Sequence, residues 1–197
     1  MRASKERPTL WVMLPHLLLA AVSVHADVPG VADLPITPPA APLSTRDWLV
    51  EPPARGARIT RSEDGAQLVL DNGLIRRTIR VAPDGATVGL DDLTTGASLL
   101  RAVRPEAVVV LDGERHEVGG LTGQPNHAFL LPGWVEQMQA QEGAFHLVSV
   151  ETGQPTERLA WERVRHHAAE LAWPPEGVAL HMTYGRTASD SLSLIHI

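Results

Sequence analysis

The most informative absence from this 197-residue sequence is that of cysteine. Without cysteine, the chain has no disulfide scaffold, no thiolate zinc site and no cysteine nucleophile. Lysine is also scarce, since Lys5 is the only one. Seventeen basic side chains stand against 23 acidic ones, and the net charge of −6 provides no whole-chain basic field to attract nucleic acid. The composition therefore excludes thiol chemistry and disfavours a nucleic-acid partner.

Long apolar runs are missing as well. The longest covers residues 10–24, which is 15 residues and short of the roughly 20 that an ordinary membrane-spanning helix needs. Three basic residues precede this run, and a small-residue cleavage pattern ending at Ala26 follows it. This is the layout of a secretory signal peptide over residues 1–26. We expect an exported protein, periplasmic or extracellular, with no membrane contact after cleavage; an uncleaved membrane anchor is the alternative.

Composition also divides the rest of the chain. Residues 27–45 contain five prolines and no apolar periodicity, which predicts a semi-rigid, Pro-rich linker. Residues 46–186 are then expected to carry the folded domain. The last segment, residues 187–197, ends in SLSLIHI, which is similar to the translated sequencing-adapter tails of some assembled reading frames. We interpret it as a tail that is not native, and a genuine terminal strand is the alternative.

The body of the chain reads as consecutive β-hairpins. Asn72-Gly73 separates the apolar runs 66–70 and 74–81, and Asp112-Gly113 separates 107–111 from 114–118. Such dipeptides between apolar runs are strong hairpin signals. Short strands that recur every 8 to 12 residues are typical of an antiparallel sandwich. Further strands are expected over residues 86–91, 98–100, 145–151 and 177–184.

The predicted fold class is therefore all-β, an antiparallel β-sandwich with little helix. A short helix is expected within residues 132–141, with Val135 and Met138 on one side. Residues 156–171 fit either state, because their apolar residues match a helical face while their context favours a strand.

No complete catalytic constellation appears. His116-Glu117 lacks a second histidine four residues after the first, so the zinc-protease spacing fails. Asp91 and Asp92 are neighbours, whereas glycosidase carboxylates flank a sugar bond at separations of roughly 5–9.5 Å. We therefore expect solvated turn residues here, and we assign no catalytic residue, no metal and no cofactor.

The best recognition candidates are Gln124, Asn126, His127 and Trp134. Amides and imidazoles bind sugar hydroxyls, and an indole ring stacks on the flat C–H face of a sugar. These four residues are predicted to bind a carbohydrate. The alternative is that Trp134 packs in the core and that the loop is structural.

Four phrases of the sequence carry a family resemblance: LDNGLIRRTIRV, DGATVGLDDLTTGASLLRAVRPEAVVVLDG, VGGLTGQPNH and AWPPEGV. Together they span roughly residues 66–184. This region resembles the N-terminal part of bacterial α-galactosidase-like proteins, from the glycoside hydrolase clan that includes families 27, 31 and 36. There, a galactose-mutarotase-like β-supersandwich precedes a (β/α)₈ catalytic barrel.

The resemblance implies a non-catalytic accessory sandwich of an exported glycoside hydrolase acting on α-linked sugars. The supersandwich would be incomplete, and the chain would be truncated before its partner, the C-terminal catalytic barrel that carries the catalytic carboxylates. No residue here matches those carboxylates. The alternative is a freestanding exported carbohydrate-binding or structural β-sandwich. A mutarotase is a third hypothesis, and it requires a positioned acid/base pair that the sequence does not show.

Overall fold

The computed structural model describes residues 28–39, 47, 50, 56–157, 174, 176–187 and 190–196. The predicted signal peptide lies outside the described residues, as do residues 158–171, for which helix and strand were alternatives. Within the part of the chain that is described, no helix has the length and apolar character to cross a membrane.

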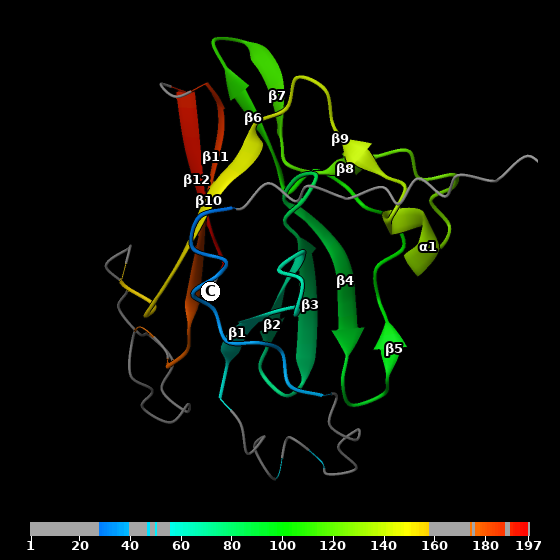
Figure 1. Cartoon of the computed structure of the whole chain (residues 1–197), viewed down its shortest axis with the longest axis vertical. Helices are drawn as coiled ribbons and strands as arrows, with labels where there is room; N and C mark the ends of the chain where they lie inside the picture. Colours follow the sequence, from blue (N-terminus) through cyan, green and yellow to red (C-terminus); the bar gives the residue numbers. More distant parts are fainter. Residues whose placement is uncertain are drawn as a thin grey trace, which may run out of the picture.

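The larger of the two main sheets has five antiparallel strands. They follow one another in sequence order, and each pairs with the next along the chain. Figure 1 shows β3 and β4 as its longest members. The five strands are β1 (Arg58–Arg61), β2 (Gln67–Asp71), β3 (Ile75–Arg80), β4 (Ala86–Asp92) and β5 (Ala97–Ser98).

The second main sheet has three antiparallel strands in the order β10-β11-β12. These are β10 (His146–Gly153), β11 (Ala179–Thr187) and β12 (Asp190–His196). Residues 190–196 belong to the segment interpreted as a tail, and in the structure they pair along β11 as a terminal strand. Among the described residues, strands in antiparallel sheets dominate and helix is almost absent, which confirms the predicted all-β, sandwich-like fold class.

Smaller elements connect the two sheets. The β6–β7 hairpin (Ala107–Leu111 and Glu114–Val118) has the predicted two-residue turn, with Asp112 at φ 52° and Gly113 at φ 85°. β8 (Leu121–Thr122) pairs with β9 (Gln139–Ala140). The helix α1 covers only Pro132–Val135, shorter than the range predicted for it, because residues 139–140 join β8 instead. Val135 and Met138 are both buried, as their shared side predicted.

The apolar core lies between the two main sheets. Alternation along β11 places Leu180, Met182 and Tyr184 in this core, each with no exposed surface. Burying an aliphatic side chain of this size contributes about 1.5–3 kcal/mol. The facing sheet contributes Ile59, Leu68 and Ile79, and the connecting elements contribute Val118 and Phe145.

Residues 28–36 also belong to this core, although their sequence reads as part of a Pro-rich linker. Val28, Val31 and Leu34 are buried in the same cluster as the strands. The Pro29 carbonyl accepts a hydrogen bond from Val150 N of β10, and the Pro35 carbonyl accepts one from Arg61 N of β1. This segment (blue in Figure 1) therefore links the two sheets, and the packed region begins before residue 46.

Candidate functional site

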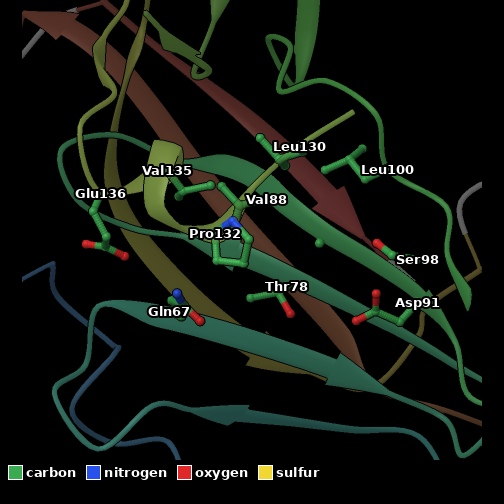
Figure 2. A pocket seen from close by; sticks show the side chains of 11 residues that line it. Gln67, Thr78, Val88, Asp91, Ser98, Leu100, Leu130, Pro132, Val135 and Glu136 are labelled. Atoms are coloured by element: carbon green, nitrogen blue, oxygen red, sulfur yellow. The ribbon is translucent and has the colours of Figure 1, made fainter. Parts of the chain in front are cut away.

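A groove of about 280 Å³ crosses the face of the larger sheet over β3 and β4. Figure 2 shows its polar side chains and its apolar walls together. Leu100, Leu130, Pro132 and Val135 form apolar surface, partly from the loop that leads into α1. The polar side chains are Gln67 from β2, Thr78 from β3, Asp91 from β4, Ser98 from β5 and Glu136 after α1.

Strand periodicity explains why these polar groups converge. Thr78 pairs with Gly89, and Asp91 pairs with Ser98, so neighbouring strands present them on one face. Two register positions of β4, Gly89 and Thr87, flank a bulge at Val88. A bulge turns side chains relative to a regular strand and is common beside binding sites. The sheet therefore supplies four of the five polar side chains of the groove, Gln67, Thr78, Asp91 and Ser98.

An ion pair fixes the helical wall of the groove. Arg80 donates from both terminal nitrogens to the Glu136 carboxylate, at 2.8 and 3.0 Å. The Arg80 side chain is 9% exposed, and its Nε donates to the Ala82 carbonyl at 2.6 Å. Bidentate pairing of this kind sets geometry as well as energy. It holds the end of α1 against β3 and orients Glu136 at the edge of the groove.

The chemistry of the groove is that of recognition. Two hydroxyls, a carboxamide and two carboxylates offer mixed donors and acceptors, and the apolar walls offer contact area. Across the described residues, no three His, Asp or Glu side chains cluster as a metal ion would require. Such a lining suits an uncharged, hydroxyl-rich molecule with apolar faces.

We compared the chain with family models, with curated proteins and with solved structures. None of them matches it. The function of the chain is therefore inferred from the residues that line the groove.

Of the four sequence-predicted recognition residues, Gln124, Asn126 and His127 lie in the loop before α1 and Trp134 lies in α1, and none of them lines the groove. The Gln124 side chain holds this loop together. Its Oε1 accepts from Val103 N, and its Nε2 donates to the carbonyls of Arg101, Asn126 and Phe129. With these four hydrogen bonds, the amide of Gln124 shapes the loop. Its predicted contact with sugar stays a prediction.

The other three predicted residues differ in their surroundings. Asn126 Oδ1 accepts from Ala128 N within the loop, and exposed His127 accepts at Nδ1 from Arg104 at 3.1 Å. Trp134 is half-buried and packs against Phe129, with ring centroids 5.2 Å apart. Trp134 lies in α1, whose residues 132 and 135 line the groove, and its contact with a sugar stays a prediction.

Sequence reasoning missed the polar side chains of the groove itself. Gln67, Thr78 and Ser98 occupy polar positions of alternating strands, and such positions ordinarily face solvent. Asp91 was recognised only as half of a carboxylate pair. In the structure the pair divides, because Asp91 lines the groove while Asp92 caps the turn before β5. Hydrogen bonds from the Thr94 hydroxyl and N–H, and from the Thr95 hydroxyl, lower the pKa of Asp92 to about 2.

A second cavity of about 340 Å³ lies on the opposite face of β3 and β4. Three of its polar side chains, Arg77, Thr87 and Glu106, are hydrogen-bonded to one another or within one network, and the fourth, Arg104, contacts His127 outside the cavity. Arg77 donates to Thr87 Oγ1 from Nε and from a terminal nitrogen, and it also bonds the Glu106 carboxylate. Thr87 N donates to that same carboxylate. Arg77, which interrupts the apolar face of its strand in the sequence, thus anchors the segment before β6 to the sheet.

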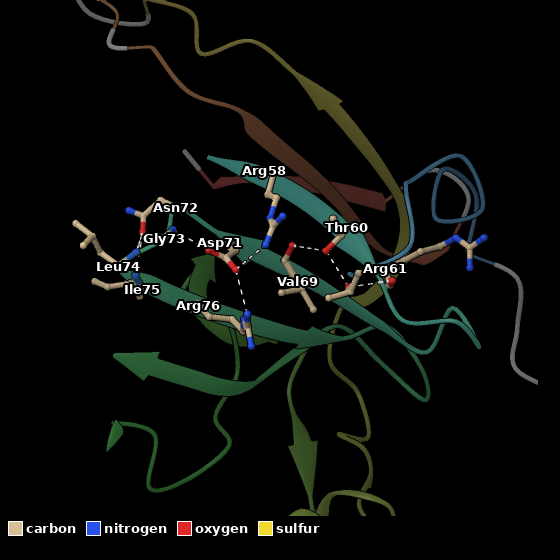
Figure 3. Close-up of polar contacts among 11 residues, drawn as sticks. Arg58, Thr60, Arg61, Val69, Asp71, Asn72, Gly73, Leu74, Ile75 and Arg76 are labelled. Atoms are coloured by element: carbon tan, nitrogen blue, oxygen red, sulfur yellow. Dashed lines mark hydrogen bonds and ion pairs between the residues drawn. The ribbon is translucent and has the colours of Figure 1, made fainter. Parts of the chain in front are cut away.

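A polar cluster outside both cavities surrounds Asp71, at the end of β2 (Figure 3). Its carboxylate accepts from Arg58 at 3.2 Å, from Arg76 at 3.1 Å and from Gly73 N at 2.7 Å. Burial on its own raises the pKa of Asp71, but the Gly73 N–H and the two guanidinium groups outweigh it and hold that pKa below its ordinary value of 3.8. Asp71 is therefore ionised in the folded protein at neutral pH.

Replacing Asp71 with asparagine is expected to lower the free energy of unfolding at pH 7 by about 1–3 kcal/mol, because two guanidinium groups lose a charged acceptor. A depressed folded-state pKa gives stability that is complete above the unfolded pKa and is lost as pH falls through the folded pKa. The difference between wild type and Asp71→Asn should therefore begin to shrink near pH 3.8 and continue to shrink as pH falls through the lower folded-state pKa. Urea unfolding at neutral pH and at acid pH measures it, and a pH-independent difference would contradict this account.

Proposed function

We propose that this chain is a non-catalytic carbohydrate-binding β-sandwich, the N-terminal accessory domain of an exported glycoside hydrolase that acts on α-linked sugars. The observation that carries the proposal is the groove over β3 and β4. It combines uncharged polar groups of Gln67, Thr78 and Ser98 with the carboxylates of Asp91 and Glu136 and with apolar walls.

This combination fits a sugar for two chemical reasons. Each sugar hydroxyl both donates and accepts, so it pairs with carboxylate, amide and hydroxyl groups alike. The C–H faces of the ring pack on apolar surface, which Leu100, Leu130 and Pro132 provide. Phe129 and Trp134, whose rings are tilted by 31° and lie 5.2 Å apart, come from the same segment of the chain as that wall, and Phe129 is 44% exposed.

The position of this domain in a larger enzyme is supported by the phrase-level resemblance over residues 66–184. In that arrangement the catalytic carboxylates belong to a C-terminal barrel, and the sandwich contributes sugar contacts and support. Export is supported by the signal-peptide pattern at residues 1–26. Sugar binding by the groove is the part of the proposal that can be measured on this chain alone.

Replacing Asp91 with alanine is expected to weaken the binding of an α-linked galacto-oligosaccharide at least about tenfold, equivalent to about 1.4 kcal/mol. The reason is the loss of a carboxylate that accepts from sugar hydroxyls inside the groove. Isothermal titration calorimetry of the full-length chain measures the dissociation constant, with a β-linked oligosaccharide of equal length as the ligand control.

Asp33→Ala is the matched variant for this experiment. Asp33 is exposed and lines neither cavity. Its replacement by alanine removes the same negative charge as Asp91→Ala does. Unchanged affinity in Asp33→Ala together with reduced affinity in Asp91→Ala supports the groove. Equal affinities in both variants, or no binding of any saccharide by the wild type, would reject the proposed function.

A further inference from the structure

The hairpin between β2 and β3 contains a reactive arrangement that is unrelated to the groove. The sequence predicts an Asn72-Gly73 turn, and the hairpin is present with Gly73 at φ 85°. Asn72 N donates to the Ile75 carbonyl, so Gly73 and Leu74 occupy the centre of the turn. Asn72 is exposed and precedes a residue without a Cβ, which leaves the Gly73 nitrogen sterically accessible.

The Asn72 side chain is folded back over its own turn. Its Oδ1 accepts from Leu74 N at 3.0 Å and from Ile75 N at 2.9 Å (Figure 3). Two backbone N–H groups therefore point at the carbonyl oxygen of the carboxamide. Donors held in this way stabilise negative charge that develops on an oxygen during attack at its carbon.

The backbone nitrogen of the next residue, Gly73, is hydrogen-bonded to a carboxylate that can act as a base. Gly73 N donates to Asp71 Oδ1 at 2.7 Å, and the Asp71 carboxylate is kept ionised by Arg58 and Arg76. A carboxylate within hydrogen-bond distance of an N–H accepts its proton as the nitrogen becomes a nucleophile. The turn thus brings together a nucleophile, a base and a pair of oxyanion donors around one carboxamide.

We infer that Asn72 is a site of self-catalysed deamidation, in which Asp71 acts as the base and the N–H groups of Leu74 and Ile75 stabilise the oxyanion. The Gly73 nitrogen forms a bond to Asn72 Cγ and gives its proton to Asp71. The bond from Cγ to the side-chain nitrogen breaks, and that nitrogen leaves as ammonia with the returned proton. Water then opens the cyclic imide to aspartate or isoaspartate. No oxidant, metal or cofactor takes part.

The product changes the turn in a defined way. Aspartate at position 72 adds a negative charge next to Asp71. Isoaspartate routes the main chain through the side-chain carbon, which lengthens a turn that joins strands in a fixed register. Modification at this single position therefore alters the turn between two interior strands of the larger sheet.

The test follows conversion of asparagine to acid by mass spectrometry in the full-length chain, incubated at about pH 8. Trypsin releases residues 62–76, which contain Asn72. Asn126, the other asparagine of the sequence, serves as the internal control, because it is also exposed but precedes His127. Asn72 is expected to react roughly tenfold faster or more in the folded protein than in the same chain unfolded in urea.

The unfolded sample separates this geometry from the ordinary reactivity of an Asn-Gly sequence. Equal rates in the two states, or faster reaction after unfolding, would overturn the inference. Asp71→Ser provides the second arm, measured at a temperature where circular dichroism shows the variant folded. It is expected to slow conversion of Asn72 several-fold while leaving Asn126 unchanged, and an unaltered rate at Asn72 would remove Asp71 from the mechanism.

Discussion

Replacing Gly119 with alanine is expected to abolish cooperative folding, with a loss of more than about 4 kcal/mol. Gly119 has φ 59°, and an ideal Cβ at this position would overlap the carbonyl oxygen of Gly85 and lie 2.8 Å from Tyr184 Cε1. Neither neighbour has room to move. The Gly85 carbonyl accepts from Gly120 N, and Tyr184 is fully buried.

Gly143→Ala is the matched control for that experiment. Gly143 also has a positive φ, 75°, but no atom lies within 4 Å of an added Cβ. Gly143→Ala should lower the free energy of unfolding only through the strain of a left-handed backbone conformation, by about 1–2 kcal/mol. Urea unfolding followed by circular dichroism compares the two variants. Similar midpoints would show that backbone conformation, and not the contact with Gly85 and Tyr184, determines the loss.

The second large effect is expected at Asp84, whose side chain is completely buried. Its carboxylate accepts from Gly85 N at 2.7 Å, from Leu147 N at 2.8 Å and from His146 Nδ1 at 2.8 Å. Alanine at this position leaves two backbone N–H groups without their acceptor. An unmet buried donor costs about 1–3 kcal/mol, so Asp84→Ala should lower the free energy of unfolding by about 2–4 kcal/mol.

The His146→Ala variant tests whether the histidine or the backbone N–H groups are the main stabilising partners of Asp84. The His146 side chain is 45% exposed, and its removal leaves Asp84 with both backbone donors. A partly exposed side-chain contact of this kind contributes about 1 kcal/mol or less, so this variant should be only slightly destabilised. If His146→Ala destabilises as much as Asp84→Ala does, the histidine and not the backbone would be the principal partner.

Much of the fold follows from local sequence signals. Asp112-Gly113 occupies the turn for which it was predicted, because both residues adopt positive φ there. The strand expected over residues 177–184 is present as β11, and alternate residues of it are buried in the core. Asn72-Gly73 predicted a hairpin, but Asn72 has no positive φ. Its side chain accepts two turn N–H groups, and the centre of the turn moves one residue along.

Other features depend on contacts that no local pattern encodes. Prolines in residues 27–45 indicated a linker, yet Val28, Val31 and Leu34 between them reach the core. In the same way, polar residues of the groove come from four strands and the end of α1. Periodicity shows only that Thr78 and Asp91 face away from the main core. It does not show that residues 130–136 fold over that face to enclose them.

The segment 28–36 has a consequence for the order of folding. Its Pro29 carbonyl pairs with Val150, a partner about 120 residues further along the chain. Contacts of such large sequence separation slow folding, because the loop between them must close first. At synthesis rates of about 5–20 residues per second, this segment leaves the ribosome some 6–24 seconds before β10 is complete. The apolar residues of segment 28–36 are therefore synthesised well before their partners in β10, and the core closes only after β10 has been made.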